Sequence, residues 1–322
     1  MDHTSMIAQT EALRMKLRVG VDLGGMSAKL GVVDENNEIV DRRVIPTEKG
    51  ITFEETIAKL ADGILSLGDV GIVGFGVPSS LMPGTDIVIY ANNLGWKNKD
   101  IKSELAKHLG DIPVYIANDA DSATVGEYFQ GAGRGYQSVL MLTLGTGVGG
   151  GFIYNGHLYR GGNGCGFEPG HMTIRMDGVP CTCGKKGCLE SYASASAIIR
   201  ELTNSENPAL KAFIAENGGK PTARMLFDAV RQGNTAAQDI LDDYVKALGV
   251  GIGSLVTILR PQIVLLGGGV SAAGDLLYRP LRAQMKETVF GYDVIGCPEI
   301  VPATLGNDAG IIGAAMLDHV LL

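Results

Sequence analysis

Three of the five cysteines in this 322-residue sequence stand close together, at positions 181, 183 and 188, in the stretch GHMTIRMDGVPCTCGKKGCLE. His171 precedes the first of them by ten positions. Thiols gathered in this way can form a disulfide with one spare thiol, a redox pair, or a metal site. These three interpretations stay open until the rest of the chain is considered.

A carboxylate stands where acid–base chemistry is expected, in YIANDADSATVGEYF. Asn118 and Asp119 end an apolar strand and precede a helix that is expected to begin near Ala120. Carboxylates at strand ends in α/β proteins face the ligand crevice. The more common role of such an aspartate is to cap the helix. The Asn-Asp doublet between two glycine loops favours a general base that takes a proton from a hydroxyl attacking a phosphate.

Three glycine-rich turns follow apolar strands: DLGG at 22–25, TLGTGVGGG at 143–151 and LLGGGV at 265–270. Glycine lets backbone N–H groups approach phosphate oxygens, although any one of these segments could be a plain tight turn. Two turns at matching places, with a third before a helix, favour a nucleotide site. GTGVGG matches the dinucleotide pattern G-x-G-x-x-G, but a strand is expected to follow it, which argues against a Rossmann loop.

Carboxylates and an imidazole surround the cysteine stretch, at Glu168, His171 and Glu190. Together they offer hydrogen-bond donors and acceptors, which suits recognition of a polyol. The alternative is that they are solvated loop charges.

Composition excludes several classes of protein. A net charge of −8, with no basic patch or tail, argues against a nucleic-acid or membrane-surface binder. No apolar run reaches the ~18 residues of a membrane span, and the N-terminus lacks the core of a signal peptide. We therefore predict a cytoplasmic protein, in which a stable disulfide is not expected.

The elements that position these residues form two α/β halves, each beginning with a strand, a glycine turn and a second strand. The first half predicts a three-stranded antiparallel meander from Leu17, followed by a helix with a capping box at Thr52 and Glu55. Further helices are expected around 100–108, from Glu190, from Thr222, over 235–259 and over 274–290, with a closing helix over 307–320. The repetition indicates an internal duplication, with a cleft between the halves.

In this order the motifs DLGG…AKLGVVD, NDADSATVGE, TLGTGVGGG, EPGHM, CTCGKKGCLESYAS and LLGGGV resemble those of the ROK family of bacterial sugar kinases and repressors. The resemblance runs from about Leu17 to the C-terminus. It implies the α/β actin-like ATPase (ribonuclease H-like) fold, with two α/β domains around a central cleft. Residues 17–117 with 306–322 would form the small domain, 118–305 the large one, and 1–16 an extension.

The resemblance also implies an activity, the ATP- and Mg²⁺-dependent phosphorylation of a hexose, with glucose and its 6-hydroxyl expected. Asp119 would be the general base. The sugar would be bound by Ser79, Asn93, Asn118, Asp119, Glu168, His171 and Glu190. The nucleotide and its Mg²⁺ would be bound by Asp22, Gly24, Gly25, Thr146, Gly147, Gly268 and Gly269.

Through the same resemblance, His171, Cys181, Cys183 and Cys188 match a structural Zn²⁺ site. One imidazole and three thiolates suit tetrahedral zinc. The C-x-C-x₄-C spacing also departs from the C-x-x-C of redox motifs. A homodimer or homotetramer is implied as well.

Two positions depart from the family pattern. Met26 follows DLGG where threonine is usual, so a hydroxyl contact with phosphate is lost there unless Ser27 replaces it. Ser79 replaces a usual glycine close to the expected sugar pocket. The alternatives are a kinase for N-acetylmannosamine or another hexose, and a non-catalytic sugar sensor. A repressor is not expected, because the 16 residues before the first strand are too few for a helix-turn-helix domain.

Overall fold

The structure, a computed structural model, describes residues 17–48, 50–91 and 94–321 and forms two compact units. Unit 1 holds the chain up to Gln137, the segment Gly151–Phe167 and the C-terminal segment from Leu305. Unit 2 holds Ser138–Gly150 and Glu168–Thr304. The predicted extension over 1–16 lies outside the described residues. No helix of the described ranges is both long and apolar enough to cross a bilayer.

Unit 1 is built on a five-stranded sheet whose order is β3-β2-β1-β4-β7. The first three strands pair antiparallel, which confirms the predicted meander, and β4 and β7 run parallel to β1. The carboxyl ends of β1, β4 and β7 therefore share one edge, where ligand-binding groups of α/β sheets gather. The strands are β1 (Leu17–Leu23), β2 (Ser27–Val33), β3 (Ile39–Pro46), β4 (Val70–Val77) and β7 (Val114–Asn118).

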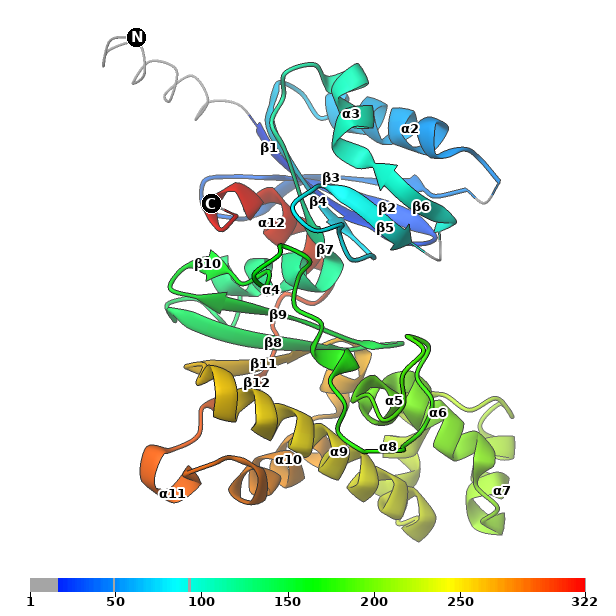
Figure 1. The fold of residues 1–322 in the computed structure, drawn as a ribbon. Helices are drawn as coiled ribbons and strands as arrows, with labels where there is room; N and C mark the ends of the chain where they lie inside the picture. The colour runs from blue at the N-terminus through cyan, green and yellow to red at the C-terminus, as the bar shows by residue number, and fades with distance from the viewer. Residues whose placement is uncertain (1–16, 49, 92–93, 322) are drawn as a thin grey trace. The chain divides into compact units, whose positions relative to one another are not determined.

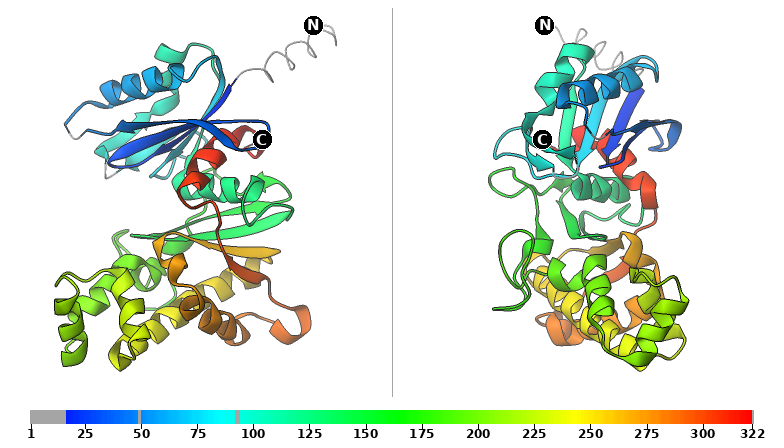
Figure 2. Two further views of the ribbon diagram at one scale, coloured as in Figure 1. Left: turned by 180° about the vertical axis from the view of Figure 1, so that it is seen from behind. Right: turned by 90° about the vertical axis from the view of Figure 1, so that its right-hand side faces the viewer.

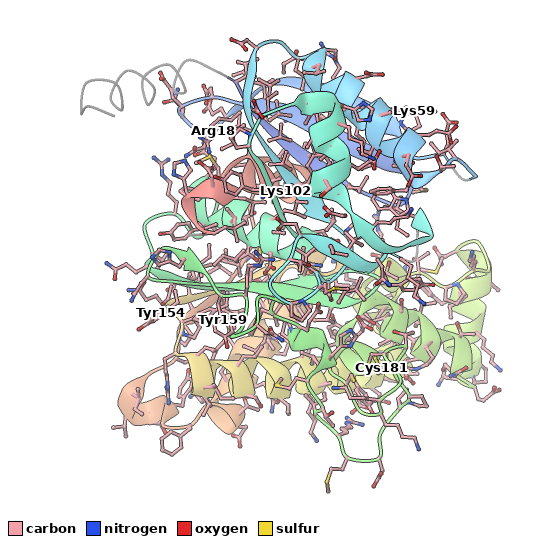
Figure 3. The ribbon with its side chains drawn as sticks, turned by 45° about the horizontal axis from the view of Figure 1, so that its top comes forward. Arg18, Lys59, Lys102, Tyr154, Tyr159 and Cys181 are labelled. Carbon is pink, nitrogen blue, oxygen red and sulfur yellow. The ribbon has the colours of Figure 1, made fainter. Side chains whose placement is uncertain are left out.

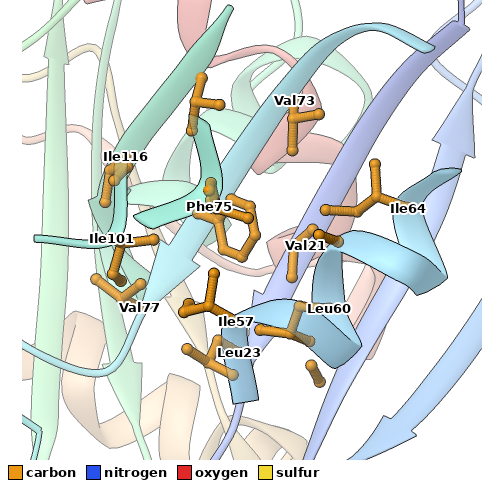
Figure 4. Close-up of a cluster of buried hydrophobic side chains, with 14 of the residues drawn as sticks. Val21, Leu23, Ile57, Leu60, Ile64, Val73, Phe75, Val77, Ile101 and Ile116 are labelled. Carbon is orange, nitrogen blue, oxygen red and sulfur yellow. The ribbon is translucent and has the colours of Figure 1, made fainter. Parts of the chain in front are cut away.

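Helices α2 (Phe53–Leu65) and α3 (Ile101–Leu109) bury one face of this sheet (Figure 1). Figure 4 shows Phe75 of β4 at the centre of that core, with side chains of α2 around it. The predicted capping box is confirmed, because the Thr52 hydroxyl accepts from Glu55 N at 3.1 Å and the Glu55 carboxylate accepts from Thr52 N at 2.8 Å.

The opposite face of the sheet packs against α12 (Ala309–Ala315), which in turn packs on α4 (Asp119–Phe129) (Figure 2). The contact with the sheet requires glycine, because a Cβ at Gly20 would lie 1.9 Å from the carbonyl oxygen of Ile311. The predicted closing helix is present but shorter, since short 3-10 turns stand before and after α12. Because α4 packs on α12, residues 118–137 belong to unit 1, whereas the predicted domain ranges grouped them with the large domain.

One hairpin of unit 1 was not predicted from the sequence. Strands β5 (Ile87–Ala91) and β6 (Trp96–Asp100) pair antiparallel and form a separate two-stranded sheet. β5 reads IVIYA, a β-branched and aromatic run that favours a strand and that the sequence analysis did not use, whereas β6 reads WKNKD, which shows no apolar alternation.

The second sheet has the order β10-β9-β8-β11-β12, and β11 runs parallel to both of its neighbours. Strand β9 begins within GTGVGG, at Val148, and no helix follows the motif, which confirms that this segment is not a Rossmann loop. The strands are β8 (Ser138–Leu144), β9 (Val148–Tyr154), β10 (His157–Leu158), β11 (Ile263–Gly267) and β12 (Glu299–Pro302).

The helices of unit 2 follow the prediction except for one break and for two helices, α7 (Pro208–Glu216) and α11 (Tyr292–Ile295), that were not predicted. The helix expected from Glu190 divides at Ser194, whose backbone is extended and whose hydroxyl accepts from Ala197 N at 3.0 Å as the cap of the next helix. The helices are α5 (Glu190–Ala193), α6 (Ala195–Asn204), α7 (Pro208–Glu216), α8 (Ala223–Arg231), α9 (Thr235–Leu259), α10 (Asp275–Thr288) and α11 (Tyr292–Ile295).

Candidate active site

The first glycine turn, Gly24–Met26, links β1 to β2 in unit 1. Gly24 N donates to Ser27 O at 2.9 Å, which closes the turn. Thr47, which follows β3, holds two of its carbonyls: Thr47 Oγ1 donates to Gly24 O at 3.2 Å and Thr47 N to Met26 O at 3.1 Å. The N–H groups of Gly25 and Met26 have no partner among the described residues. Two adjacent unpaired N–H groups form a site suited to a phosphate oxygen.

The second glycine turn, Gly145–Gly147, links β8 to β9 and repeats this arrangement. Gly145 N donates to Gly147 O at 3.0 Å. The carbonyls of Gly145 and Thr146 accept from Ala195 N at 2.8 Å and from Ser196 Oγ at 2.7 Å. Within the described part of the chain, the N–H groups of Thr146 and Gly147 are again unpaired. Each turn thus holds its carbonyls back and leaves two N–H groups for a ligand.

Asp22 is the second-last residue of strand β1 and stands two positions before the first glycine turn. Burial raises the pKa of this carboxyl, and Lys29, whose Nζ is 3.8 Å from Asp22 Oδ2, only partly opposes the shift. A partly buried carboxylate whose charge Lys29 only partly compensates is a natural ligand for Mg²⁺, which prefers oxygen donors.

Asn118 and Asp119 stand where β7 passes into α4, as predicted. Asn118 caps the helix, since its Oδ1 accepts from Ala120 N at 2.8 Å, and Asp119 is the first helical residue, with an exposed side chain. The capping role considered for Asp119 is therefore filled by Asn118. Asp119 Oδ1 also accepts from Ala120 N, at 2.9 Å, which orients the carboxylate.

Ser79 is buried at 7% exposure, and its hydroxyl already serves the main chain. Its Oγ donates to Tyr90 O at 2.8 Å and accepts from Tyr90 N at 3.3 Å, which holds strand β5 near its end. Asn118 Nδ2 donates to Ser79 O at 3.4 Å. A sugar contact by the Ser79 hydroxyl stays a prediction, and Asn93, the other residue expected nearby, lies outside the described residues.

A cavity of about 630 Å³ opens beside the first glycine turn, in unit 1. Gly25, Met26, Thr47 and Trp96 contribute to its lining. Met26 is 87% exposed, so its side chain forms no part of the core. As a thioether it has no hydrogen-bond donor to offer a ligand.

Glu190, the first residue of α5, joins two parts of unit 2. Its Oε2 accepts from Val148 N at 3.0 Å, just after the second glycine turn, and its Oε1 lies 3.8 Å from Cys181 Sγ. A Cβ at Gly147 would lie 2.3 Å from Glu190 Oε2, so any other residue there would have to displace this carboxylate. Glu168 precedes the 3-10 turn Pro169–His171 and is exposed.

His171, Cys181, Cys183 and Cys188 form one cluster, whose ligand atoms all lie within 4.8 Å of one another. His171 Nδ1 is 3.7 Å from Cys181 Sγ, and Cys183 Sγ is 3.7 Å from Cys188 Sγ. Thiolates at ~2.3 Å from a tetrahedral Zn²⁺ are about 3.8 Å apart, so the arrangement fits that ion. Figure 3 labels Cys181 in the loop that carries the cluster.

Gly268 and Gly269 follow β11 and open the 3-10 turn Gly269–Ala273. Gly269 lines a cavity of about 310 Å³. Arg224, Phe227 and Arg231 of α8 also line it, and the sequence analysis did not identify these three residues. Their spacing of three and four positions places them on one helix face, a signal present in the sequence. Both guanidinium groups pair with Asp228, at 3.4 and 2.7 Å.

Comparison with known proteins supports one family. The sequence profile of the ROK family matches residues 18–320. The chain is 38% identical over 311 residues to a glucokinase of Thermotoga maritima, covering 94% of this chain and 97% of that protein. It is 31% identical over 316 residues to an N-acetyl-D-glucosamine kinase of Haemophilus influenzae, covering 92% and 98%. The crystal structure of a ROK family glucokinase from Streptomyces griseus in complex with glucose and AMPPNP matches with a TM-score of 0.79 at 33% identity, covering 94% and 98%.

Proposed function

The chain belongs to the ROK family, and on that premise we propose that it is an ATP-dependent kinase for the 6-hydroxyl of glucose. The similarity to ROK sugar kinases of known structure confirms the predicted actin-like ATPase fold. The observation that carries the proposal is the pair of glycine turns, each with two unpaired N–H groups, in a chain that is 38% identical to a glucokinase.

In the proposed reaction, Asp119 accepts the proton of the 6-hydroxyl. The resulting oxygen attacks the γ-phosphorus in line, a new P–O bond forms, and the bond between the γ-phosphorus and the bridging oxygen of ADP breaks. The N–H groups of Gly25, Thr146 and Gly147 donate to phosphate oxygens and stabilise the charge of the transition state. General-base help of this kind contributes about 10²–10⁴-fold to the rate.

Asp22 would hold the Mg²⁺ that accompanies ATP, which its partly buried carboxyl with a raised pKa supports. When bound, Mg²⁺ neutralises charge on the phosphates. Gly268 and Gly269, with the cavity closed by Phe227, would bind the adenosine.

Sugar hydroxyls would be bound by Asn118, Glu168, His171 and Glu190, with Ser79 and Asn93 as further predicted contacts. In the cluster His171 Nδ1 faces Cys181 Sγ, so the other ring nitrogen is available to a hydroxyl. His171 with the three cysteines would hold a structural Zn²⁺, which supplies a crosslink that fixes the loop.

The test is the variant Asp119→Asn, with formation of glucose 6-phosphate as the readout. We expect turnover to fall by at least about 10²-fold while glucose still binds, because the amide keeps the shape of the carboxylate but cannot take the proton. A variant that kept a tenth of wild-type turnover would contradict the assignment of Asp119 as the base.

A second candidate is phosphorylation of an N-acetylated hexose, which the 31% identity to an N-acetyl-D-glucosamine kinase favours. It uses the same base and the same turns, so only the sugar pocket separates the two functions. The cytoplasmic location and the dimeric or tetrameric state stay predictions.

A further inference from the structure

We infer that the histidine–cysteine cluster controls the conformation of the second glycine turn, and through it the affinity for ATP. The inference rests on the proposed function, in which this turn binds the phosphates. It assigns Glu190 and Ser196 as positioning residues for the donor, in addition to the sugar contact proposed for Glu190. The connection is a short segment, Cys188–Ser196, which we call the clamp segment.

The clamp segment begins inside the cluster. Cys188 is completely buried, and Thr173 pairs with it in an antiparallel bridge. The next residue, Leu189, donates its N–H to Met172 O at 2.9 Å. Met172 directly follows His171, so the two chain segments that supply cluster ligands are joined where the clamp segment starts.

The clamp segment then contacts the second glycine turn at three points. Glu190 Oε2 accepts from Val148 N at 3.0 Å, at the end of the turn. The break of the helix at Ser194 lets the first N–H of α6, that of Ala195, donate to Gly145 O at 2.8 Å. Ser196 Oγ donates to Thr146 O at 2.7 Å. These bonds fix the carbonyls of the turn and so the direction of the unpaired N–H groups.

Close packing leaves the turn little room to adjust. A Cβ at Gly147 would lie 2.3 Å from Glu190 Oε2, and a Cβ at Gly170 would lie 1.9 Å from Val148 O. Gly170 is the neighbour of His171, so both cluster-bearing segments pack against the turn. A shift in either segment therefore moves the turn.

The first glycine turn supplies an internal control, because among the described residues only Thr47 donates to its carbonyls, and Thr47 belongs to unit 1. Loss of metal from the cluster removes nothing from that support. The inference therefore predicts that nucleotide affinity depends on metal through the second turn only.

The first experiment measures binding of a fluorescent ADP analogue, without sugar, to the full chain before and after the cluster is stripped by a zinc chelator. Mg²⁺ is then restored to both samples. We expect about tenfold weaker binding in the stripped protein, and recovery on adding Zn²⁺. Circular dichroism checks that the stripped chain stays folded.

Should the stripped chain unfold, a variant with an intact cluster provides the test. Ser196→Ala removes one bond to the turn, and Ser196→Thr keeps the hydroxyl. For Ser196→Ala we expect KM for ATP to rise about three- to tenfold, with KM for glucose and the zinc content unchanged. Ser196→Thr should restore KM for ATP to near the wild-type value.

Two results would overturn the inference but leave the proposed function intact, provided that the metal-loaded wild-type protein phosphorylates glucose. One is unchanged ADP affinity in stripped, folded protein, and the other is an unchanged KM for ATP in Ser196→Ala. A different result, wild-type metal-loaded protein that binds no nucleotide, would contradict the proposed function and this inference together.

Discussion

The two glycine turns have the same internal design but different support. In each, one N–H closes the turn, two carbonyls accept hydrogen bonds, and two N–H groups have no partner in the part of the chain that the structure describes. Within that part, the carbonyls of the first turn accept from one residue, Thr47, which uses both its N–H and its hydroxyl. Behind the second, the N–H and the hydroxyl come from Ala195 and Ser196, in a segment that starts at the cysteine cluster.

The strands that lead into the turns differ in one further respect. β1 ends in Asp22-Leu23 and β8 in Thr143-Leu144, each followed by a glycine of the turn, so a carboxylate in unit 1 matches a hydroxyl in unit 2. If both turns bind phosphate, as proposed, the two have different further roles. The first would have a cation ligand beside it, Asp22, and the second would depend on a loop that also carries the predicted sugar contacts.

The largest effect is expected at Asp22, the carboxylate that only the first turn has. Asp22→Asn should lower kcat by about 10²–10³-fold, since a charge that stabilises the phosphoryl transfer is lost.

Burial raises the pKa of Asp22 from its ordinary 3.8, so the stability linked to its protonated form is lost as pH rises above that value. In Mg²⁺-free buffer the variant should therefore unfold at a higher temperature than wild type at pH 7, and this advantage should shrink towards pH 4. An advantage that is the same at both pH values would contradict the role of burial.

The next effect is expected at Gly147, where the second turn meets Glu190. Gly147→Ala should displace the Glu190 carboxylate and break its bond to Val148 N, with a loss of about 10- to 100-fold in kcat/KM for ATP. Gly145→Ala is the matched control, since nothing lies within 4 Å of a Cβ there, and its effect should be much smaller. Equal losses in the two variants would show that the Glu190 contact does not set the turn.

A moderate effect is expected at Thr47, the support of the first turn. Thr47→Val removes the hydroxyl bond to Gly24 O, worth about 0.5–1.5 kcal/mol, and should raise KM for ATP about two- to tenfold. Thr47→Ser keeps the hydroxyl and should stay close to wild type. Steady-state kinetics at saturating glucose measure both, and a Thr47→Val effect confined to KM for glucose would contradict the assignment.

The smallest effect is expected at Met26, the side chain that distinguishes the first turn from the family pattern. Because Met26 is 87% exposed, Met26→Thr should change the free energy of unfolding by less than about 0.5 kcal/mol. The main-chain N–H groups bind phosphate in either variant, so kcat/KM for ATP should stay within about threefold. Denaturant unfolding and steady-state kinetics measure the two quantities. A rise of more than tenfold in kcat/KM for ATP would show that the side chain at position 26, and not the backbone alone, determines how the first turn binds ATP.

The features that the sequence predicted well are local ones. The capping box of Thr52 and Glu55 depends on two side chains three positions apart, and the glycine turns on short strand–turn–strand patterns. The cysteine cluster also forms where the spacing within one loop placed it.

The features that were missed depend on long-range packing or on weak local signals. Ser196 reaches a carbonyl fifty positions away and Thr47 one that is twenty-three away, and a hydroxyl carries no mark of such a partner. The break at Ser194 interrupts a sequence that otherwise favours helix, because extended backbone there lets α6 begin against the turn. Arg224, Phe227 and Arg231 were missed although their spacing of three and four positions indicates a shared helix face in the sequence.

The most direct test of the central claim is ADP release from Mg-ATP by zinc-loaded protein, with glucose, mannose, N-acetylmannosamine, N-acetylglucosamine and fructose offered in turn. The proposal predicts the highest kcat/KM with glucose and formation of glucose 6-phosphate. ADP release with an N-acetylated sugar alone would support the proposed phosphoryl transfer but show that glucose is not the substrate. No release with any sugar, from folded protein, would contradict the account of this chain as a sugar kinase.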